Sequence, residues 1–140
     1  MLKTFFVVVL LMFSSCATQH AEKLSLYQRI GGKDVLYKVS AETLDKVAED
    51  PKTMRSFDGV KMDSLKESLT NFLCVETGGD CVYEGETMEN SHADAEITMA
   101  EFELMVHAMR EAMDHNNVGI REKNELLKIL APMKRDVVTK

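Results

Sequence analysis

Apolar residues recur every three or four positions along most of this chain, a spacing that predicts α-helices rather than β-strands. One stripe ends at Asp50-Pro51, because the residue before a proline disfavours the helical conformation. A second follows Thr98, a predicted N-cap with Glu101 three residues on, and a third meets Pro132, which bends or ends its last turn. The three stripes consist of Leu36, Val39, Thr43 and Val47; of Phe102, Met105, Val106, Met109 and Met113; and of Leu126, Leu127, Leu130 and Met133. We therefore predict an all-α fold.

Two glycines end a further helix near the middle of the chain. Gly78-Gly79 follows an apolar helical run, and glycine enters the left-handed conformation without steric cost. We expect this helix to stop near Thr77. Its apolar residues are Leu65, Leu69, Phe72 and Leu73.

The helical pattern resumes at Thr87, where Met88 and His92 are four residues apart. This spacing places both side chains on one face of a helical turn. A single histidine on such a face is more often packed or solvated than a metal ligand, so the spacing alone assigns no role to His92.

The length and charge of the chain limit its function classes. Its 140 residues suit one domain, and the formal net charge is −6. Lys and Arg are not clustered and do not alternate with aromatic residues, so the electrostatic signature of a nucleic-acid-binding protein is missing. Nucleic acid is therefore an unexpected partner.

The first residues resemble a secretory signal peptide. A basic start at Lys3 precedes the apolar run 5–13, which is far shorter than the roughly 20 residues of a membrane-spanning helix. Small residues then precede Cys16, an arrangement similar to a bacterial lipobox. We expect a signal peptide over 1–15, a lipidated Cys16 with a tether to residue 24, and one domain over 25–140. The implied location is the periplasmic side of a bacterial membrane, with the outer membrane favoured because residue 17 is not Asp; the alternative is ordinary cleavage nearby.

Export to an oxidising compartment would allow the other two cysteines to form a disulfide. With Cys16 as the lipid site, Cys74 and Cys81 remain as an even pair across the glycine turn. A disulfide between them would brace the corner before His92. Two free thiols are the alternative. Neither a Cys-x-x-Cys spacing nor a second nearby histidine favours zinc.

Several segments occur in the order found in one protein family. They are Ser25-Leu26-Tyr27-Gln28-Arg29-Ile30-Gly31-Gly32, Ala48-Glu49-Asp50-Pro51, Ser56-Phe57, Thr77-Gly78-Gly79, the stretch from Tyr83 to His92 and the stretch from Leu126 to Val138. Each is a weak signal alone. Together they resemble the group I truncated haemoglobins, the two-on-two globins, over essentially all of the chain from Ser25 onward.

The resemblance implies a haem cofactor, iron protoporphyrin, with His92 as the ligand of the iron. Residues that match contacts with the porphyrin are Phe57, Phe72, Met88 and Met105. Each of them could instead belong to an ordinary core, since periodicity does not separate a cofactor wall from a core.

On the gas-binding side the chain departs from the family pattern. Leu44 stands where many members have a tyrosine, and Leu65 and Leu69 stand where polar residues line the next helix; Ser68 is one position off. These leucines would leave a bound gas without a hydrogen-bond donor, so we expect fast O2 release. Thr43 is the one nearby hydroxyl that could substitute.

The function implied by the resemblance is reversible binding, and hence transport, of O2 or of another diatomic gas such as NO or CO by a haem-containing lipoprotein. Two alternatives stay open. Nitric-oxide detoxification of the dioxygenase type would need an electron-donor protein as a partner, and a non-haem helical interaction lipoprotein would use the stripes only as core. We expect His107 and His115 to be surface residues, and His20 to lie in the tether.

Overall fold

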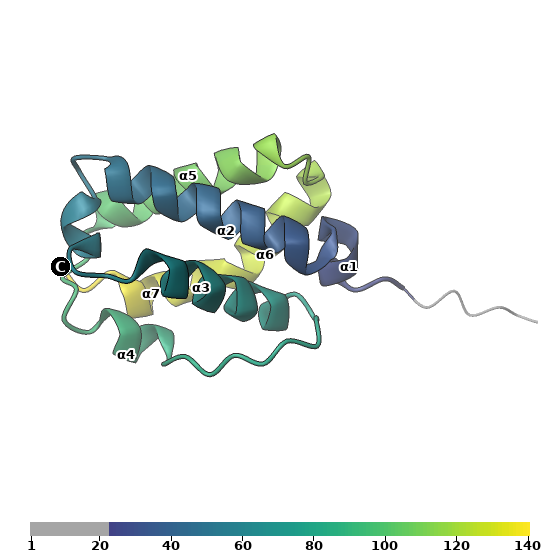
Figure 1. Ribbon diagram of the computed structural model, residues 1–140, viewed down its shortest axis with the longest axis horizontal. Helices are drawn as coiled ribbons and strands as arrows, with labels where there is room; N and C mark the ends of the chain where they lie inside the picture. The colour runs from purple at the N-terminus through teal and green to yellow at the C-terminus, as the bar shows by residue number, and fades with distance from the viewer. Residues whose placement is uncertain (1–22) are drawn as a thin grey trace, which may run out of the picture.

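The computed structural model describes residues 23–140. The signal segment, Cys16 and His20 lie outside the described residues. All regular elements within 23–140 are helical, so the predicted all-α class is confirmed. In chain order (Figure 1) they are α1 (Leu26–Ile30), α2 (Gly32–Glu49), the 3-10 turn η1 (Met54–Phe57), α3 (Met62–Glu76), α4 (Met88–His92), α5 (Met99–His115), α6 (Ile120–Leu130), the 3-10 turn η2 (Ala131–Met133) and α7 (Lys134–Val137). In this part of the chain no helix is long and apolar enough to cross a bilayer.

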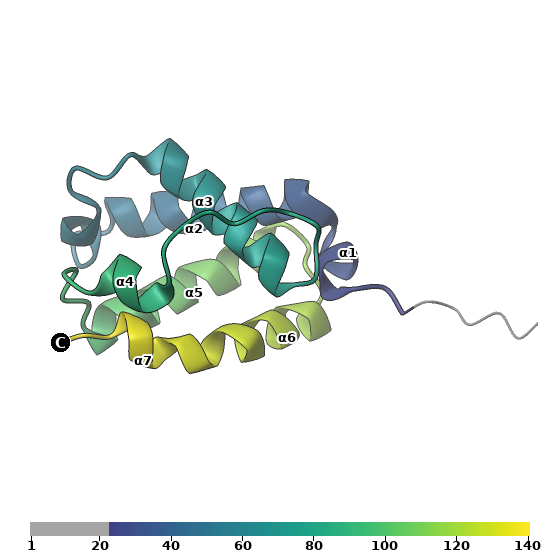
Figure 2. The same ribbon diagram turned by 90° about the horizontal axis from the view of Figure 1, so that it is seen from below.

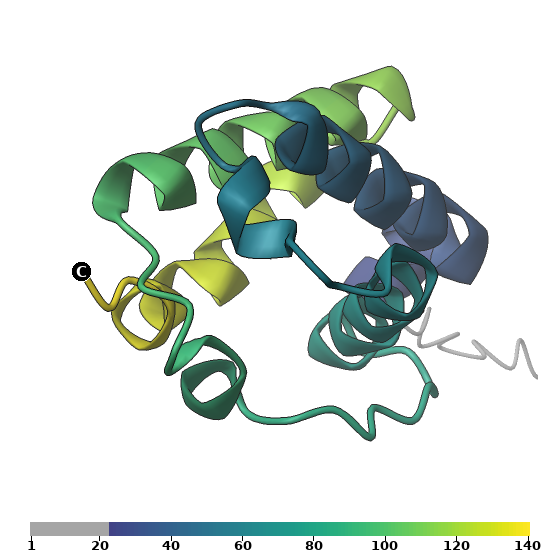
Figure 3. The same ribbon diagram turned by 60° about the vertical axis from the view of Figure 1, so that its left-hand side comes forward.

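Helix α2 is the centre of the fold and packs against both α5 and α3. The end-on view of Figure 3 shows α3 and α4 linked by the long loop between them, and Figure 2 shows α4 beside α7, against which it packs. The core is apolar, and each fully buried aliphatic side chain contributes about 1.5–3 kcal/mol. Its largest fully buried apolar side chains are Leu36, Val39, Leu73, Met113 and Leu126.

The helix ends follow local chemistry, as predicted. Helix α2 stops with Asp50 as its C-cap, directly before Pro51. Helix α3 stops with Thr77 as its C-cap, where the Thr77 hydroxyl donates to the Leu73 carbonyl at 2.7 Å. Gly78 follows with a φ of 84°, the left-handed conformation that favours glycine.

Helix α5 begins as predicted but presents a different face to the core. Thr98 and Glu101 form a capping box, in which each side chain pairs with the backbone of the other residue. The predicted stripe is only partly buried, because Phe102 and Val106 are half-exposed. The fully buried residues of α5 are Glu101, Ala108, Met109, Ala112 and Met113.

Pro132 interrupts the last helical segment, as predicted. Helix α6 ends at Leu130, the 3-10 turn η2 contains the proline, and α7 continues after it. Proline removes a backbone donor and so breaks the regular helical bonding at this point. The chain changes direction there and brings α7 to α4.

Cys74 and Cys81 form a disulfide with a Cα–Cα distance of 5.9 Å. It joins the end of α3 to the loop that leads to α4. Gly79 lies inside this small loop, and a Cβ added there would collide with the sulfur of Cys74 and lie 2.9 Å from the Tyr27 ring. Position 79 therefore requires a residue without a side chain.

Candidate functional site

The short helix α4 presents His92 and is capped at its start by Thr87. The Thr87 side chain accepts a hydrogen bond from the Asn90 amide at 3.1 Å, and the Ser91 hydroxyl donates to the Thr87 carbonyl at 2.8 Å. These bonds satisfy backbone groups that a five-residue helix leaves free at its ends. They fix the start of the turn on which Met88 and His92 lie.

The His92 ring has a defined tautomer. Its Nδ1 lies 2.8 Å from the Met88 carbonyl oxygen, one helical turn earlier. Because a carbonyl oxygen can only accept, Nδ1 must donate this hydrogen bond, and in the neutral ring the free lone pair is then on Nε2. This is how metal-binding histidines are usually held, with one nitrogen oriented by a backbone carbonyl and the other available to the metal. His92 can thus act as a metal ligand through Nε2.

Apolar side chains that the resemblance assigned to the cofactor or to the gas-binding side come from four different elements. Leu69 of α3, Met88 of α4 and Met105 of α5 are half-buried and pack against the core cluster, which includes Phe72. Phe57 is also half-buried, on η1, and lines an open pocket of about 410 Å³ together with Ala48, Met54, Arg55, Asp58 and Met62. The structure therefore brings Leu69, Phe72, Met88 and Met105 into one apolar assembly, with Phe57 at a separate pocket wall.

The proposed gas-binding side is apolar. Leu44 is buried in α2, and Leu65 and Leu69 are half-buried on α3. Thr43 is fully buried, and its hydroxyl donates to the Val39 carbonyl at 2.6 Å. The hydroxyl proton is therefore already used within the helix. Thr43 does not offer a free donor, contrary to what its position in the sequence suggested.

The loop between α3 and α4 is braced by an aromatic contact as well as by the disulfide. The Phe72 and Tyr83 rings meet edge to face, with their centroids 5.4 Å apart. The Tyr83 hydroxyl donates to the Glu86 carbonyl at 2.8 Å, just before Thr87. Tyr83 thus connects the core residue Phe72 to the start of α4.

Sequence reasoning missed a polar contact on the other side of α4. Arg55 of η1 donates to the Glu96 carbonyl at 2.8 Å and to the Glu101 carboxylate at 2.7 Å. The sequence identified Glu101 only as a cap residue. No local signal pairs it with Arg55, because the two are 46 positions apart.

The chain is similar to known proteins in sequence. The sequence profile of the bacterial-like globins matches residues 25–139. The chain belongs to this family. It is 30% identical over 119 residues to a group 1 truncated haemoglobin of Mycolicibacterium paratuberculosis, a match that covers 85% of this chain and 88% of that protein. It is 22% identical to a group 1 truncated haemoglobin of Tetrahymena pyriformis, over 83% of this chain and 96% of that protein.

Solved structures agree on the fold. The ferric truncated haemoglobin of Tetrahymena pyriformis is similar with a TM-score of 0.78 at 21% identity, over 84% of this chain and 100% of that one. The two-on-two haemoglobin of a Synechococcus species, solved with covalently attached haem, has a TM-score of 0.76 at 22% identity, with the same coverages. The predicted resemblance to the two-on-two truncated globins is confirmed.

The two other histidines of this truncated globin that the structure describes lie on its surface, as predicted. The side chains of His107 and His115 are 66% and 78% exposed, and each faces a glutamate, Glu111 and Glu42 respectively. The hydrogen bond with His115 lowers the pKa of Glu42 despite the opposing effect of burial. Within residues 23–140 no three His, Cys, Asp or Glu side chains gather into a metal-binding group.

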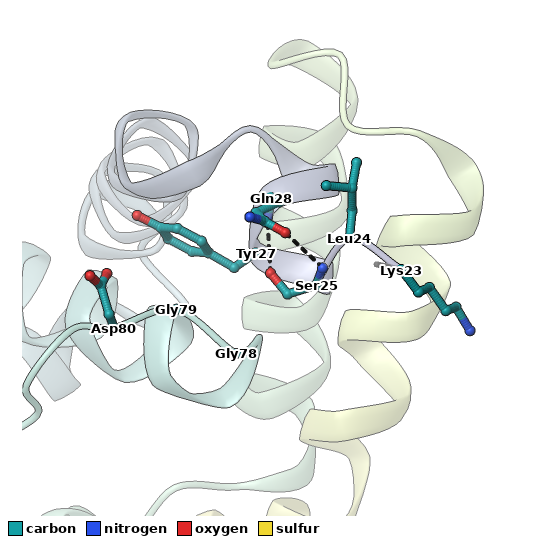
Figure 4. A pocket seen from close by; sticks show the side chains of 8 residues that line it. All are labelled: Lys23, Leu24, Ser25, Tyr27, Gln28, Gly78, Gly79 and Asp80. Atoms are coloured by element: carbon teal, nitrogen blue, oxygen red, sulfur yellow. Dashed lines mark hydrogen bonds between the residues drawn. The ribbon is translucent and has the colours of Figure 1, made fainter. Parts of the chain in front are cut away.

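Another surface pocket, of about 520 Å³, lies away from the candidate residues. Figure 4 shows it between the start of α1 and the glycine turn after α3. Its polar side chains Ser25 and Gln28 are occupied with each other, since they form the capping box of α1. None of the candidate site residues lines this pocket, and we assign it no role in the chemistry of the site.

Proposed function

We propose that this truncated globin binds haem through Nε2 of His92 and reversibly binds a small diatomic gas. The observation that carries the proposal is the hydrogen bond from Nδ1 of His92 to the Met88 carbonyl, which leaves Nε2 as a free donor of its lone pair. Haem held by this one histidine would keep an open coordination position on the iron, at which a gas could bind. Membership of the bacterial-like globin family supports the choice of haem over another metal group.

The donor set and the surrounding side chains fit this cofactor. A single histidine with an oriented ring is accompanied by apolar side chains from α3, α4 and α5, as a flat apolar macrocycle requires. Phe57, Phe72, Met88 and Met105 would contact it. On the gas-binding side Leu44, Leu65 and Leu69 would exclude water and offer only dispersion contacts to the gas.

O2, NO and CO are the gases that such a site would take. We favour reversible gas binding over nitric-oxide detoxification, because detoxification needs electrons from a donor protein and no described residue points to one. Thr43 does not alter this expectation, since its hydroxyl already donates to Val39.

We further propose that the protein acts on the exported side of a bacterial membrane, attached through lipid on Cys16, with the outer membrane favoured. The disulfide between Cys74 and Cys81 supports an oxidising compartment, because such bonds form and persist mainly outside the cytosol. Labelling with a radioactive fatty acid, compared between the full chain and a Cys16→Ala variant, tests the anchor. Equal labelling of both would contradict it.

Haem binding is tested by absorbance spectroscopy of purified protein after haem addition. We expect an intense band near 400 nm that is lost in His92→Ala but kept in His107→Ala and His115→Ala, which remove exposed histidines as matched controls. The reason is that a lone axial ligand has no substitute. A normal haem spectrum from the His92→Ala variant would refute the assignment, and colourless unsubstituted protein would favour the non-haem interaction lipoprotein.

A further inference from the structure

Arg55 connects two segments that border the proposed haem site from different directions. It lies on η1, two residues before Phe57, and its guanidinium reaches the loop that follows α4. There it donates to the carbonyl of Ala95 at 3.4 Å and to the carbonyl of Glu96 at 2.8 Å. Both acceptors follow His92 within four residues. Figure 1 shows η1 and this loop at the same end of the molecule.

The loop that Arg55 holds has an unfavourable backbone conformation. Glu96 has a φ of 48°, in the left-handed region that residues other than glycine rarely adopt. Its carbonyl faces Arg55, so the cation binds the backbone where the chain turns away from α4. Arg55 thus stabilises a turn that the local sequence does not favour.

Glu101 completes the contact from a third segment. Its side chain is 8% exposed, and its carboxylate accepts from Arg55 at 2.7 Å and from the amide and hydroxyl of Thr98 at 2.8 and 2.7 Å. Burial would raise the pKa of Glu101, but these hydrogen bonds outweigh it and lower the pKa to about 2. The carboxylate therefore stays charged at neutral pH, and the pair with Arg55 is charge-assisted.

We propose that Arg55 is a positioning residue for haem. It ties the turn that carries Phe57 to the loop that leaves His92, so that two segments that would contact the cofactor are held together. This inference rests on the proposed function, since it presupposes that His92 binds haem. Helix α4 needs such a tie because five residues do not form a stable helix alone. The C-terminal segment holds the same loop at two further points: the amides of Thr139 and Lys140 donate to the Ile97 carbonyl, and the Lys140 ammonium donates to the Glu96 carboxylate at 3.1 Å.

The test is the rate of haem release from the full-length, haem-loaded protein, measured as transfer to excess apomyoglobin. Arg55→Gln should release haem about tenfold faster, the effect of losing one charge-assisted hydrogen bond between partly buried groups. Glu101→Gln should show a smaller increase in the same direction, because glutamine still completes the capping box with Thr98. Arg55→Lys should restore part of the retention, since it keeps the charge but not the two-pronged geometry.

Arg29→Gln is the matched control. Arg29 also pairs with carboxylates, Glu122 at 2.7 Å and Glu125 at 2.6 Å, but it joins α1 to α6 at the opposite end of the molecule. This variant should lose stability without faster haem release. In resonance Raman spectra of the ferrous protein, Arg55→Gln should shift the iron–histidine stretching band and Arg29→Gln should leave it in place.

Two results would overturn the inference. One is an unchanged release rate and unchanged Raman band in Arg55→Gln, and the other is equal acceleration by Arg29→Gln, which would make the effect one of general stability. Either result leaves the proposed function standing if the unsubstituted protein binds haem. Failure of the unsubstituted protein and of every variant to bind haem would overturn both.

Discussion

Gas release should depend on one position of α2, because the side chains assigned to the proposed gas-binding side, Leu44, Leu65, Leu69 and Thr43, offer no free hydrogen-bond donor. Leu44 is only 2% exposed, and the hydroxyl of its neighbour Thr43 is bonded to the Val39 carbonyl. Leu44→Tyr would add a donor at the position where many family members have one. Thr43→Val is the matched control, since it removes the hydroxyl and changes the shape of the side chain very little.

The magnitude follows from one hydrogen bond. A neutral donor that reaches a bound O2 contributes on the order of 1–2 kcal/mol, which corresponds to about a tenfold slower release. Carbon monoxide depends less on such a donor, so its release should change little. Tyrosine is larger than leucine, and at a site this buried the added volume should cost about 1–3 kcal/mol of stability. Thr43→Val should leave both release rates unchanged, because the Val39 carbonyl keeps its backbone hydrogen bond within the helix.

Stopped-flow measurement of O2 and CO release from the three proteins checks these expectations. The unsubstituted protein should release O2 quickly and have a high ratio of CO to O2 affinity. Slow O2 release that becomes fast in Thr43→Val would refute the reasoning, because the Thr43 hydroxyl would then be the donor. Slow release that is unaffected by Thr43→Val would mean that a water molecule or another group supplies the hydrogen bond.

Two further predictions concern the parts that hold α4. Reduction of the Cys74–Cys81 disulfide should lower the free energy of unfolding by about 2–3 kcal/mol. Gly79→Ala should lower this free energy by a similar amount. The control Gly59→Ala, with open space around the added Cβ, should cost only about 1–2 kcal/mol of backbone strain. Coincident urea transitions with and without reductant would contradict this. Because the pKa of Glu101 is lowered from 4.5 to about 2, its contribution to stability is present above pH 4.5 and is lost as pH falls toward 2. Glu101→Gln should flatten the stability profile in that window, and parallel profiles would disprove it.

The helix ends could be predicted because each has a cause in neighbouring residues. Proline 51 excludes helix at Asp50, Gly78 permits the left-handed turn after α3, and Thr98 caps α5. The buried face of α5 could not be predicted in the same way. The predicted stripe (residues 102, 105, 106, 109 and 113) and the buried face (residues 101, 108, 109, 112 and 113) share only residues 109 and 113, and the packing of α2 against α5 selects the second.

The candidate site was predictable only as far as its interactions are short-range. Met88 and His92 are four residues apart, which in a helix places the His92 ring near the Met88 carbonyl that orients it. The bond from Thr43 to Val39 has the same spacing, and a threonine inside a helix commonly makes it. The hydroxyl could therefore have been excluded as a donor from the sequence. The contact of Arg55 with Glu101 depends on how η1 meets α5, which no local pattern encodes.

The proposed site has two tasks, gas release and haem retention, and they depend on different parts of the fold. Gas release would depend on side chains of α2 and α3, helices of 18 and 15 residues that pack directly on each other. Haem retention would depend on α4, which has five residues and is held by neighbouring segments: the disulfide and Tyr83 before it, Arg55 after it and α7 beside it. Substitutions that act on these partners should change the rate of haem loss and leave gas release nearly unchanged. Substitutions at Leu44 should do the reverse, since effects at sites without shared partners are close to additive.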